Sequence, residues 1–276
     1  MKKTWFITGT SKGFGRVWAE AALERGDQVA ATARHLDSLE ELNEKYGDNV
    51  LTLALDVTDK TAVDTAVRQA HDYFGRLDVI VNNAGYGQFG AMEEISEQEA
   101  RDQLETNLFG ALWVTQAALP YLREQGSGHI IQVSSIGGVN AFPYIGMYHA
   151  SKWGLEGFSQ ALNQEVQALG IKVTLIEPIG YTTDWAGPSA RFARELPAYD
   201  HVREANSARR SSAVRGNPEA TGPVMLKLVD MEQPPLRIFF GKGAHEMIHA
   251  EYEKRLAEWD KFKVLSEEAH GELPVA

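Results

Sequence analysis

Short apolar runs alternate with segments of helical periodicity along most of this chain of 276 residues. The first apolar run is Trp5–Thr8, and a glycine-rich stretch separates it from a segment in which Val17, Ala21 and Ala22 share one helical face. Strands separated by helices of such length indicate a parallel sheet that is covered by helices on both faces. The sequence therefore predicts an α/β fold with a doubly wound, parallel sheet of about seven strands.

The same alternation predicts one Rossmann-like domain over residues 1–276. Its expected strands are 5–8, 29–33, 50–55, 78–81, 129–133, 172–176 and 236–240, and its expected helices include 36–46, 60–74, 97–122, 146–169, 218–230 and 246–262. The pattern loosens over 181–215, where we expect short helices that form a mobile cover for the substrate. Residues 243–276 are expected to form a C-terminal helical extension, frayed after Ser266.

Composition limits the class of partner. Lys and Arg number 27 against 38 Asp and Glu, and this net charge of -11 opposes binding to nucleic acid or to anionic membranes. A small-molecule partner is expected. The chain has no cysteine, so disulfides and thiolate metal sites are excluded, and no metal site is predicted. Neither a signal-peptide core nor an apolar run of roughly 18 residues is found, which predicts a soluble, cytoplasmic protein.

Two motifs carry chemistry. Tyr148 and Lys152 lie one helical turn apart, so a phenol and an ammonium would project from one face, and the cation would lower the pKa of the phenol. Alone, this spacing could be a surface pair. The glycines of Gly9-x-x-x-Gly13-x-Gly15 follow a predicted strand and open a predicted helix, as a pyrophosphate-binding loop requires. An ordinary glycine turn is the alternative, because the spacing differs from the commoner G-x-G-x-x-G.

The motifs occur in one characteristic order. Along the chain these are Thr8-Gly9-x-x-x-Gly13-x-Gly15, Asn82-Asn83-Ala84-Gly85, Asn107, Ser135 and Tyr148-x-x-x-Lys152. Together they resemble the short-chain dehydrogenase/reductase family, in its shorter, non-extended branch, over about residues 4 to 240. The resemblance implies an oxidoreductase that transfers a hydride between a nicotinamide cofactor and a carbonyl or alcohol substrate.

By this resemblance the catalytic set is Asn107, Ser135, Tyr148 and Lys152. Tyr148 would give its proton to the carbonyl oxygen, and Ser135, whose spacing fits better than that of Ser134, would hold that oxygen. Lys152 would lower the pKa of Tyr148 and hold the nicotinamide ribose, and Asn107 would bind a water that connects the lysine to solvent. Taken alone, the serine could satisfy a strand-end backbone group, and the asparagine could be a locally bonded helix residue.

Cofactor binding is expected from a larger set of residues. The resemblance assigns it to Gly9, Ser11, Lys12, Gly13, Phe14, Gly15, Arg34, Asp56, Val57, Asn83, Ala84, Gly85, Tyr148, Lys152, Pro178, Gly180 and Thr183. Ala33 stands where an acidic residue would favour NAD, whereas Arg34 and Lys12 suit a 2′-phosphate, so NADP(H) is the preferred cofactor and NAD(H) remains possible. Asp56 and Thr183 could instead cap the turns that follow them.

The substrate and the assembly are less constrained. Ile179 replaces the glycine that usually follows this proline in the family. Several side chains placed near the catalytic end favour an apolar or aromatic ketone or aldehyde: Tyr86, Gln88, Phe89, Phe142, Tyr144, Met147, Tyr181 and Trp185. The alternatives are an NAD-retaining epimerase or dehydratase, or an NAD(P)-binding regulator that senses redox state without turnover. By analogy, a homodimer or homotetramer is expected through helices 97–122 and 146–169.

Overall fold

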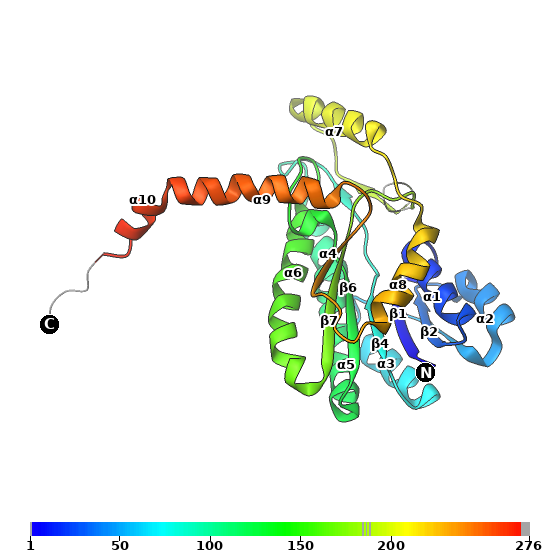
Figure 1. Ribbon diagram of the computed structural model, residues 1–276. Coiled ribbons are helices and arrows are strands. Elements are labelled where there is room, and N and C mark those ends of the chain that lie inside the picture. Colours follow the sequence, from blue (N-terminus) through cyan, green and yellow to red (C-terminus); the bar gives the residue numbers. More distant parts are fainter. Residues whose placement is uncertain (1, 184, 186, 188, 272–276) are drawn as a thin grey trace.

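A single parallel sheet forms the centre of the computed structural model, which describes residues 2–183, 185, 187 and 189–271 (Figure 1). Its strands are β1 (Thr4–Thr8), β2 (Gln28–Ala33), β3 (Val50–Ala54), β4 (Val79–Asn82), β6 (Gly128–Val133), β7 (Ile171–Pro178) and β9 (Arg237–Phe240). They lie in the order β3-β2-β1-β4-β6-β7-β9, and each neighbouring pair runs parallel. The predicted α/β fold with seven parallel strands is confirmed.

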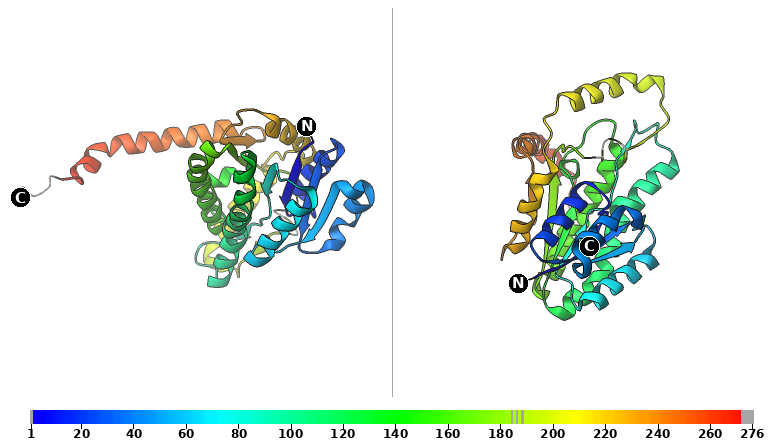
Figure 2. Two further views of the ribbon diagram at one scale, coloured as in Figure 1. Left: turned by 90° about the horizontal axis from the view of Figure 1, so that it is seen from below. Right: turned by 90° about the vertical axis from the view of Figure 1, so that its right-hand side faces the viewer.

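Helices cover both faces of this sheet (Figures 1 and 2). On one face lie α1 (Gly13–Glu24), α2 (Glu40–Tyr46) and α8 (Thr221–Asp230), and on the other lie α3 (Lys60–Phe74), α5 (Gly110–Gln125) and α6 (Gly146–Val166). Successive strand residues point to opposite faces, so Trp5 and Ile7 pack with α1 and α8, whereas Phe6 packs with α3 and α5. An apolar core thus lies on each face of the sheet, and polar side chains lie at the ends of the strands.

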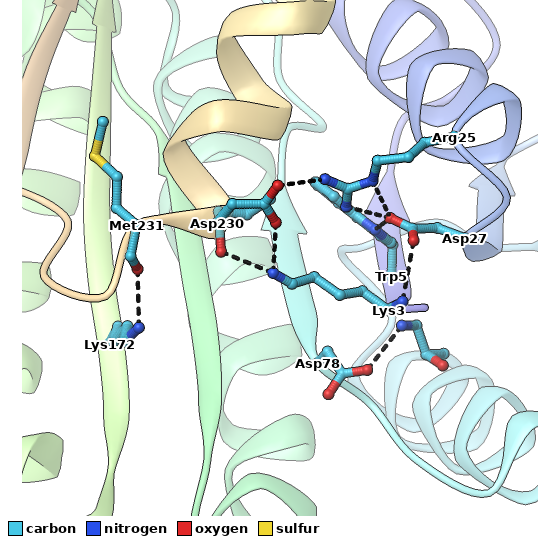
Figure 3. A network of polar contacts seen from close by, with 10 residues as sticks. Lys3, Trp5, Arg25, Asp27, Asp78, Lys172, Asp230 and Met231 are labelled. Carbon is cyan, nitrogen blue, oxygen red and sulfur yellow. Dashed lines mark hydrogen bonds and ion pairs between the residues drawn. The ribbon is translucent and has the colours of Figure 1, made fainter. Parts of the chain in front are cut away.

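A polar network lies at the amino-terminal ends of the central strands (Figure 3). The buried Asp27 carboxylate accepts hydrogen bonds from Trp5 Nε1 at 2.8 Å and from the Lys3 backbone N at 3.0 Å, and it pairs with Arg25. Arg25 Nη1 and Lys3 Nζ both reach the Asp230 carboxylate, at 2.9 and 2.7 Å. This network joins the C-terminal end of α8 to the amino-terminal ends of β1 and β2, away from the candidate functional residues at the carboxyl ends.

The predicted helix 97–122 is interrupted. It consists of α4 (Glu97–Leu104), a π-helical turn η3 (Glu105–Phe109) and α5. Helix α4 begins in a capping box, in which Ser96 accepts from the Glu99 backbone and the Glu99 carboxylate accepts from the Ser96 backbone. Short 3-10 turns complete this part of the fold: η1 (Leu36–Leu39), η2 (Gly47–Asn49), η4 (Ile136–Gly138), η5 (Gln167–Leu169) and η8 (Pro218–Ala220). The predicted helix 36–46 is thus divided between η1 and α2.

A separate layer lies above the carboxyl ends of the strands. Within 181–215 the chain forms β8 (Arg191–Phe192), η7 (Pro197–Tyr199) and α7 (Asp200–Ser212), and β8 pairs with β5 (Gln88–Phe89). Figure 1 shows α7 standing over the sheet edge. We predict short helices here, but α7 is one helix of 13 residues. Residues 184, 186 and 188 of the predicted cover lie outside the described residues.

The C-terminal extension leaves the body of the protein (Figures 1 and 2). It consists of α9 (Ala244–Lys261) and α10 (Lys263–Glu268), and α9 agrees within two residues with the predicted helix 246–262. The root of α9 is anchored by Ala244 and Ile248, which are buried against Ile136 and Val139. The end of the predicted frayed tail, residues 272–276, lies outside the described residues. Among the helices of the described part, none combines the length and apolar character needed to cross a bilayer.

Candidate active site

The residues singled out from the sequence meet at the carboxyl ends of the strands. The glycine loop follows β1, the turn Asn82–Gly85 follows β4, and Ser135 follows β6 by two residues. Strand β1 lies between β2 and β4, so the chain order reverses at this point of the sheet. Such a reversal opens a crevice between strand ends, where doubly wound folds bind ligands.

The glycine loop needs its glycines for two different reasons. Gly9 and Gly13 have φ angles of 70° and 60°, in the left-handed region. Gly15 is required by close approach, because a Cβ there would lie 2.4 Å from the Gly9 carbonyl oxygen. The Asn83 amide holds the loop by donating to the Thr8 and Gly9 carbonyl oxygens at 2.9 and 3.0 Å. The loop is thereby held against β4, at the start of α1.

The turn after β4 joins this loop to the side chains that the sequence predicts to be catalytic. The Ala84 backbone N donates to Thr8 Oγ1 at 2.9 Å. Next to it, Gly85 faces Asn107 and Lys152, since a Cβ on Gly85 would lie 3.0 Å from Asn107 Oδ1 and 3.7 Å from Lys152 Nζ. A Cβ at position 85 would therefore press against Asn107 and come into ordinary van der Waals contact with Lys152.

Tyr148 and Lys152 project from the first turns of α6. Lys152 Nζ lies 5.8 Å from the centre of the Tyr148 ring and donates to the Val133 carbonyl oxygen at 2.7 Å. Ser135 is near enough to the Tyr148 phenol to influence its pKa, and its Oγ accepts from the Gly137 backbone N at 3.0 Å. The hydroxyl and the phenol are thus positioned to hold one substrate oxygen between them.

Burial dominates the protonation of both groups. It raises the pKa of Tyr148 to about 12, while the nearby Ser135 hydroxyl lowers that pKa by less. Burial also lowers the pKa of Lys152 to about 8, and the Glu156 carboxylate raises it by less. The net shift of the Tyr148 pKa is thus upward because burial outweighs the opposing influence, and the lowering of this pKa by Lys152 stays a prediction. At neutral pH the phenol keeps its proton, as an acid catalyst must.

Asn107 lies in the π-helical turn between α4 and α5. Its Oδ1 accepts from the Tyr86 backbone N, and its Nδ2 donates to the Tyr86 carbonyl oxygen, both at 3.0 Å. Nδ2 also donates to Ser151 Oγ at 3.2 Å. The buried side chain therefore ties the segment after β4 to α6, one residue from Lys152. Wide turns of this kind inside α-helices frequently occur at functional sites.

Residues expected at the adenosine end also come together. A hollow of about 500 Å³ lies at the ends of β2 and β3, and its lining includes Arg34, His35 and Asp56. Asp56 caps its own turn as well, since its Oδ1 accepts from the Thr58 backbone N at 3.0 Å. The Val57 side chain is buried and points away, against Gly110 of α5. The Val57 side chain is therefore not available to a ligand in the hollow, whose lining does not include this residue.

The glycine loop and Thr183 lie together where the sequence predicts the phosphate end of the site. Ser11 and Lys12 are exposed in the loop, and no side chain caps the first backbone N–H groups of α1. Thr183 lies beside the loop, with its Cβ 3.9 Å from where a Cβ on Gly13 would be. Phe14 packs away from the loop, with its ring centre 5.2 Å from that of Trp18. Across the described residues, no three His, Asp or Glu side chains gather as a metal site would require.

Comparison with known proteins identifies the family. The sequence profile of the short chain dehydrogenase family matches residues 3–192. The chain belongs to this family. It is 43% identical over 270 residues to oxidoreductase BOA17 of Botryotinia fuckeliana, covering 96% of this chain and 98% of that protein. This short-chain dehydrogenase is therefore an oxidoreductase.

Two solved structures are similar along most of the chain. A short-chain dehydrogenase from Streptomyces avermitilis has a TM-score of 0.91 and 37% identity, and the match covers 97% of this chain and 98% of that one. An alcohol dehydrogenase from Thermococcus sibiricus, complexed with 5-hydroxy-NADP, has a TM-score of 0.73 and 25% identity, with coverage of 87% and 96%. The first match spans nearly the whole dehydrogenase.

The strand that ends at Pro178 carries the departure from the family pattern. Ile179, which replaces the usual glycine, extends the sheet ladder by donating from its backbone N to the Phe240 carbonyl oxygen at 2.9 Å. Its side chain packs against the buried apolar cluster that includes Ala244 and Ile248 of the first turns of α9. Gly180 follows and is exposed. In this dehydrogenase the isoleucine therefore serves the attachment of the C-terminal extension.

His149, which the sequence analysis leaves out, positions the Ser135 loop. Its Nε2 accepts from the Phe142 backbone N at 2.8 Å, and its Nδ1 therefore carries the proton and donates to the Gly137 carbonyl oxygen at 2.7 Å. Burial lowers the pKa of His149, which favours this neutral form. Its place directly after Tyr148 is the only signal in the sequence that could have found it.

The sequence also gave no prediction for a buried pair of carboxylates near Lys152. Glu156 lies one turn after Lys152 on α6, and Glu177 lies next to the end of β7, fully buried. Arg237 Nε donates to Glu156 Oε2 at 2.9 Å and lies 3.6 Å from Glu177 Oε1. The single guanidinium thus faces two carboxylates, and burial together with the Glu156 charge raises the pKa of Glu177 to about 8.

Proposed function

We propose that this protein is an NADP-dependent carbonyl reductase or alcohol dehydrogenase that acts on an apolar or aromatic ketone or aldehyde, or on the matching alcohol. The observation that carries the proposal is the convergence of Ser135, Tyr148 and Lys152 beside the glycine loop. The phenol is protonated, lies near Ser135 and is held on a helix whose lysine lies beside the Gly85 turn. The cofactor would supply the hydride.

In this proposal each side chain acts on a defined atom. Tyr148 Oη donates its proton to the carbonyl oxygen during reduction and accepts it back during oxidation. Ser135 Oγ holds the same oxygen, and its position depends on the backbone N–H of Gly137. Lys152 holds the ribose hydroxyls with the ammonium that otherwise bonds Val133. Asn107 fixes the backbone of Tyr86, which keeps the floor of the site rigid.

The described residues fit a dinucleotide. The positive φ angles of Gly9 and Gly13, the close approach at Gly15 and the uncapped N–H groups of α1 provide a backbone cradle for a pyrophosphate. We assign NADP over NAD because Arg34 lines the hollow at the end of β2, where the preceding residue is Ala33 rather than an acid. The similar alcohol dehydrogenase that holds 5-hydroxy-NADP supports this choice.

The decisive variant is Tyr148→Phe, which removes the acid and keeps the ring. The purified protein is assayed with NADPH and NADH against a panel of ketones and aldehydes. We expect wild-type turnover with NADPH, a fall of about 100-fold or more in kcat for the variant, and unchanged NADPH affinity by calorimetry. Undiminished turnover would refute the role of Tyr148. Binding of NADPH without net oxidation by any carbonyl compound would favour a regulator or an NAD-retaining epimerase.

We also propose that the segment 181–215 covers the substrate. Within it, Trp185 lies with its ring centre 4.8 Å from that of Tyr148, and 5.6 Å from that of Phe89. These contacts place aromatic surface next to the catalytic phenol, which suits an apolar substrate. The domain assignment is likewise a proposal: one catalytic domain over the whole chain, extended by residues 243–276.

A second copy of the chain is the partner that we propose for the extension. Large apolar side chains along α9 and α10 stay exposed, including Leu256 at 54%, Trp259 at 65% and Phe262 at 48%. Each aromatic side chain can bury roughly 150–250 Å². Covering this stripe would thus bury several hundred Å² per chain, which is comparable to the roughly 800 Å² per partner in stable interfaces. The helices α4, α5 and α6 are the other proposed contact in a homodimer or homotetramer.

A further inference from the structure

A buried cluster of charged side chains lies near the amino-terminal turns of α6. Lys152 and Glu156 are both buried, and their spacing of four residues places them one turn apart on the same face of the helix. Glu177 of β7 and Arg237 of β9 complete the cluster, so its charges come from three elements. Of these four groups, only Lys152 has a role in the proposed reaction.

The two carboxylates share one guanidinium unequally. Arg237 Nε donates to Glu156 Oε2 at 2.9 Å, whereas it lies 3.6 Å from Glu177 Oε1. Glu177 is fully buried, and neither of its carboxylate oxygens has a hydrogen-bond partner among the described residues. An ionised carboxylate is costly to bury without such partners. Glu177 therefore keeps the proton, in agreement with its raised pKa, and Glu156 carries the negative charge.

The second oxygen of Glu156 lies beside the turn that follows β6. A Cβ on Gly138 of this turn would lie 3.3 Å from Glu156 Oε1 and 2.6 Å from Ser134 Oγ. Both oxygens are buried and have no hydrogen-bond partner in the described part of the chain. Ser134 directly follows Val133, whose carbonyl oxygen accepts from Lys152 Nζ at 2.7 Å. Glu156 therefore lies between the guanidinium and the segment that binds the lysine.

The charge of Glu156 acts on Lys152. Burial lowers the pKa of Lys152 to about 8, and the Glu156 carboxylate opposes this shift. His149, another titratable side chain of α6, is held neutral by the backbones of Gly137 and Phe142. Without the charge of Glu156, the lysine would lose its proton closer to neutral pH. A neutral amine has one N–H group fewer and no positive charge for the ribose hydroxyls.

We propose that Glu156 is a positioning residue of the reaction, whose carboxylate keeps Lys152 a cation while Glu177 holds the proton of the carboxylate pair. The pair then has a single negative charge, which is located on the helix that carries Tyr148 and Lys152. Arg237 fixes this charge from β9 through its bond to Glu156 Oε2. The inference rests on the proposed function, because that function requires a charged lysine beside the ribose.

The pH dependence of carbonyl reduction tests this role, with NADPH and the ketone of the panel that is reduced fastest, both at saturation. Wild-type kcat is expected to fall as the pH rises through about 8, because Lys152 loses its proton there. Glu156→Gln removes the charge and keeps the size of the side chain, so the fall should move to lower pH by about one unit. Glu156→Asp keeps the charge and should recover at least half of this shift. Glu165→Gln, at an exposed position of the same helix, should leave the profile unchanged.

A direct titration of Lys152 separates this test from that of the proposed function. The protein is labelled with ¹³C at the ε carbon of lysine, and Lys152→Met identifies the Lys152 signal in the NMR spectrum by its loss. In the protein without cofactor, this signal should titrate about one pH unit lower in Glu156→Gln than in the wild type. Glu177→Gln should shift it less, because Glu156 keeps its charge there.

The outcomes of the titration are distinct. An unmoved Lys152 signal in Glu156→Gln, or a larger shift in Glu177→Gln than in Glu156→Gln, would overturn the inference. If Glu156→Gln does not fold, Glu156→Gln combined with Arg237→Gln leaves no unpaired guanidinium, and the same downward shift is expected relative to Arg237→Gln alone. If no carbonyl compound is reduced, the proposed function fails, whereas the titration of Lys152 still decides the role of Glu156.

Discussion

Replacement of the buried Glu177 by glutamine should change how the stability of the protein depends on pH. The side chain is fully buried, and its neighbourhood holds one guanidinium, that of Arg237, for two carboxylates. Burial and the negative charge of Glu156 raise the pKa of Glu177 to about 8, although Arg237 opposes the shift. Glu177 therefore keeps a proton in the folded protein at neutral pH, whereas the unfolded chain releases it near the ordinary value of about 4.5.

The sign and size of the effect follow from this difference. Between the two pKa values the folded protein binds more protons than the unfolded chain, so the contribution of Glu177 to stability is lost as the pH rises through about 8. Each pH unit in this window changes the free energy of unfolding by about 1.4 kcal/mol. Glutamine is always neutral. From about pH 5 to about pH 8, Glu177→Gln should therefore gain up to about 4 kcal/mol relative to the wild type.

Urea denaturation at constant ionic strength, followed by tryptophan fluorescence from about pH 5 to about pH 8, measures this gain. The exposed Glu165 of the same helix as Glu156 supplies the control, and Glu165→Gln should follow the wild-type curve. The pKa of the buried His129 is lowered to about 3, which adds an opposite slope in acid. That slope is common to all variants and cancels in the differences. A difference in the free energy of unfolding between Glu177→Gln and the wild type that does not change with pH would refute the reasoning.

The other predictions concern the cofactor loop and the extension. Arg34→Asp should raise the Michaelis constant for NADPH about 10- to 100-fold and much less for NADH, and equal effects would contradict the NADP assignment. Gly15→Ala should lower stability by about 1–3 kcal/mol and weaken NADPH binding, because its Cβ would lie 2.4 Å from the Gly9 carbonyl oxygen. Gly157→Ala has open space and should stabilise by about 0.5–1 kcal/mol in thermal melts. Trp259→Glu should shift the protein toward monomers in light scattering, and an unchanged mass would exclude the stripe from the interface.

Local signals were sufficient for most of the fold. Helix α3 has the predicted bounds Lys60–Phe74, because Asp59 caps its first turn by accepting from the Ala62 backbone N and Gly75 ends it in the left-handed conformation. The π-helical turn at Glu105–Phe109 is different. A single widened turn changes the apolar spacing too little to be read from periodicity, although it positions Asn107. The pair of two-residue strands β5 and β8 was missed for a similar reason, since two residues show no alternation.

The candidate site, too, was predictable from the sequence only in part. The order of its motifs predicted which segments meet, because parallel strands bring their carboxyl ends to one edge. The protonation of Tyr148 could not be predicted, since it depends on burial by Trp185, which is distant in sequence. The same is true of Glu177, whose pKa depends on β9 bringing Arg237 next to β7. The spacing within a motif predicts which of its residues lie side by side. A pKa also depends on side chains from distant segments that bury the group or place a charge beside it.

The projecting helix α9 also offers a practical route to measurement. Its 18 residues form a rod about 27 Å long, and Val264 beyond its end is 68% exposed. The chain has no cysteine, so Val264→Cys would introduce a single thiol on α10, a helix that lies well away from the sheet (Figure 1). In the proposed oligomer, a spin label there would yield distances between subunits from one labelling reaction. The same thiol could tether the enzyme to an electrode or a bead with its reactive face turned toward the solution.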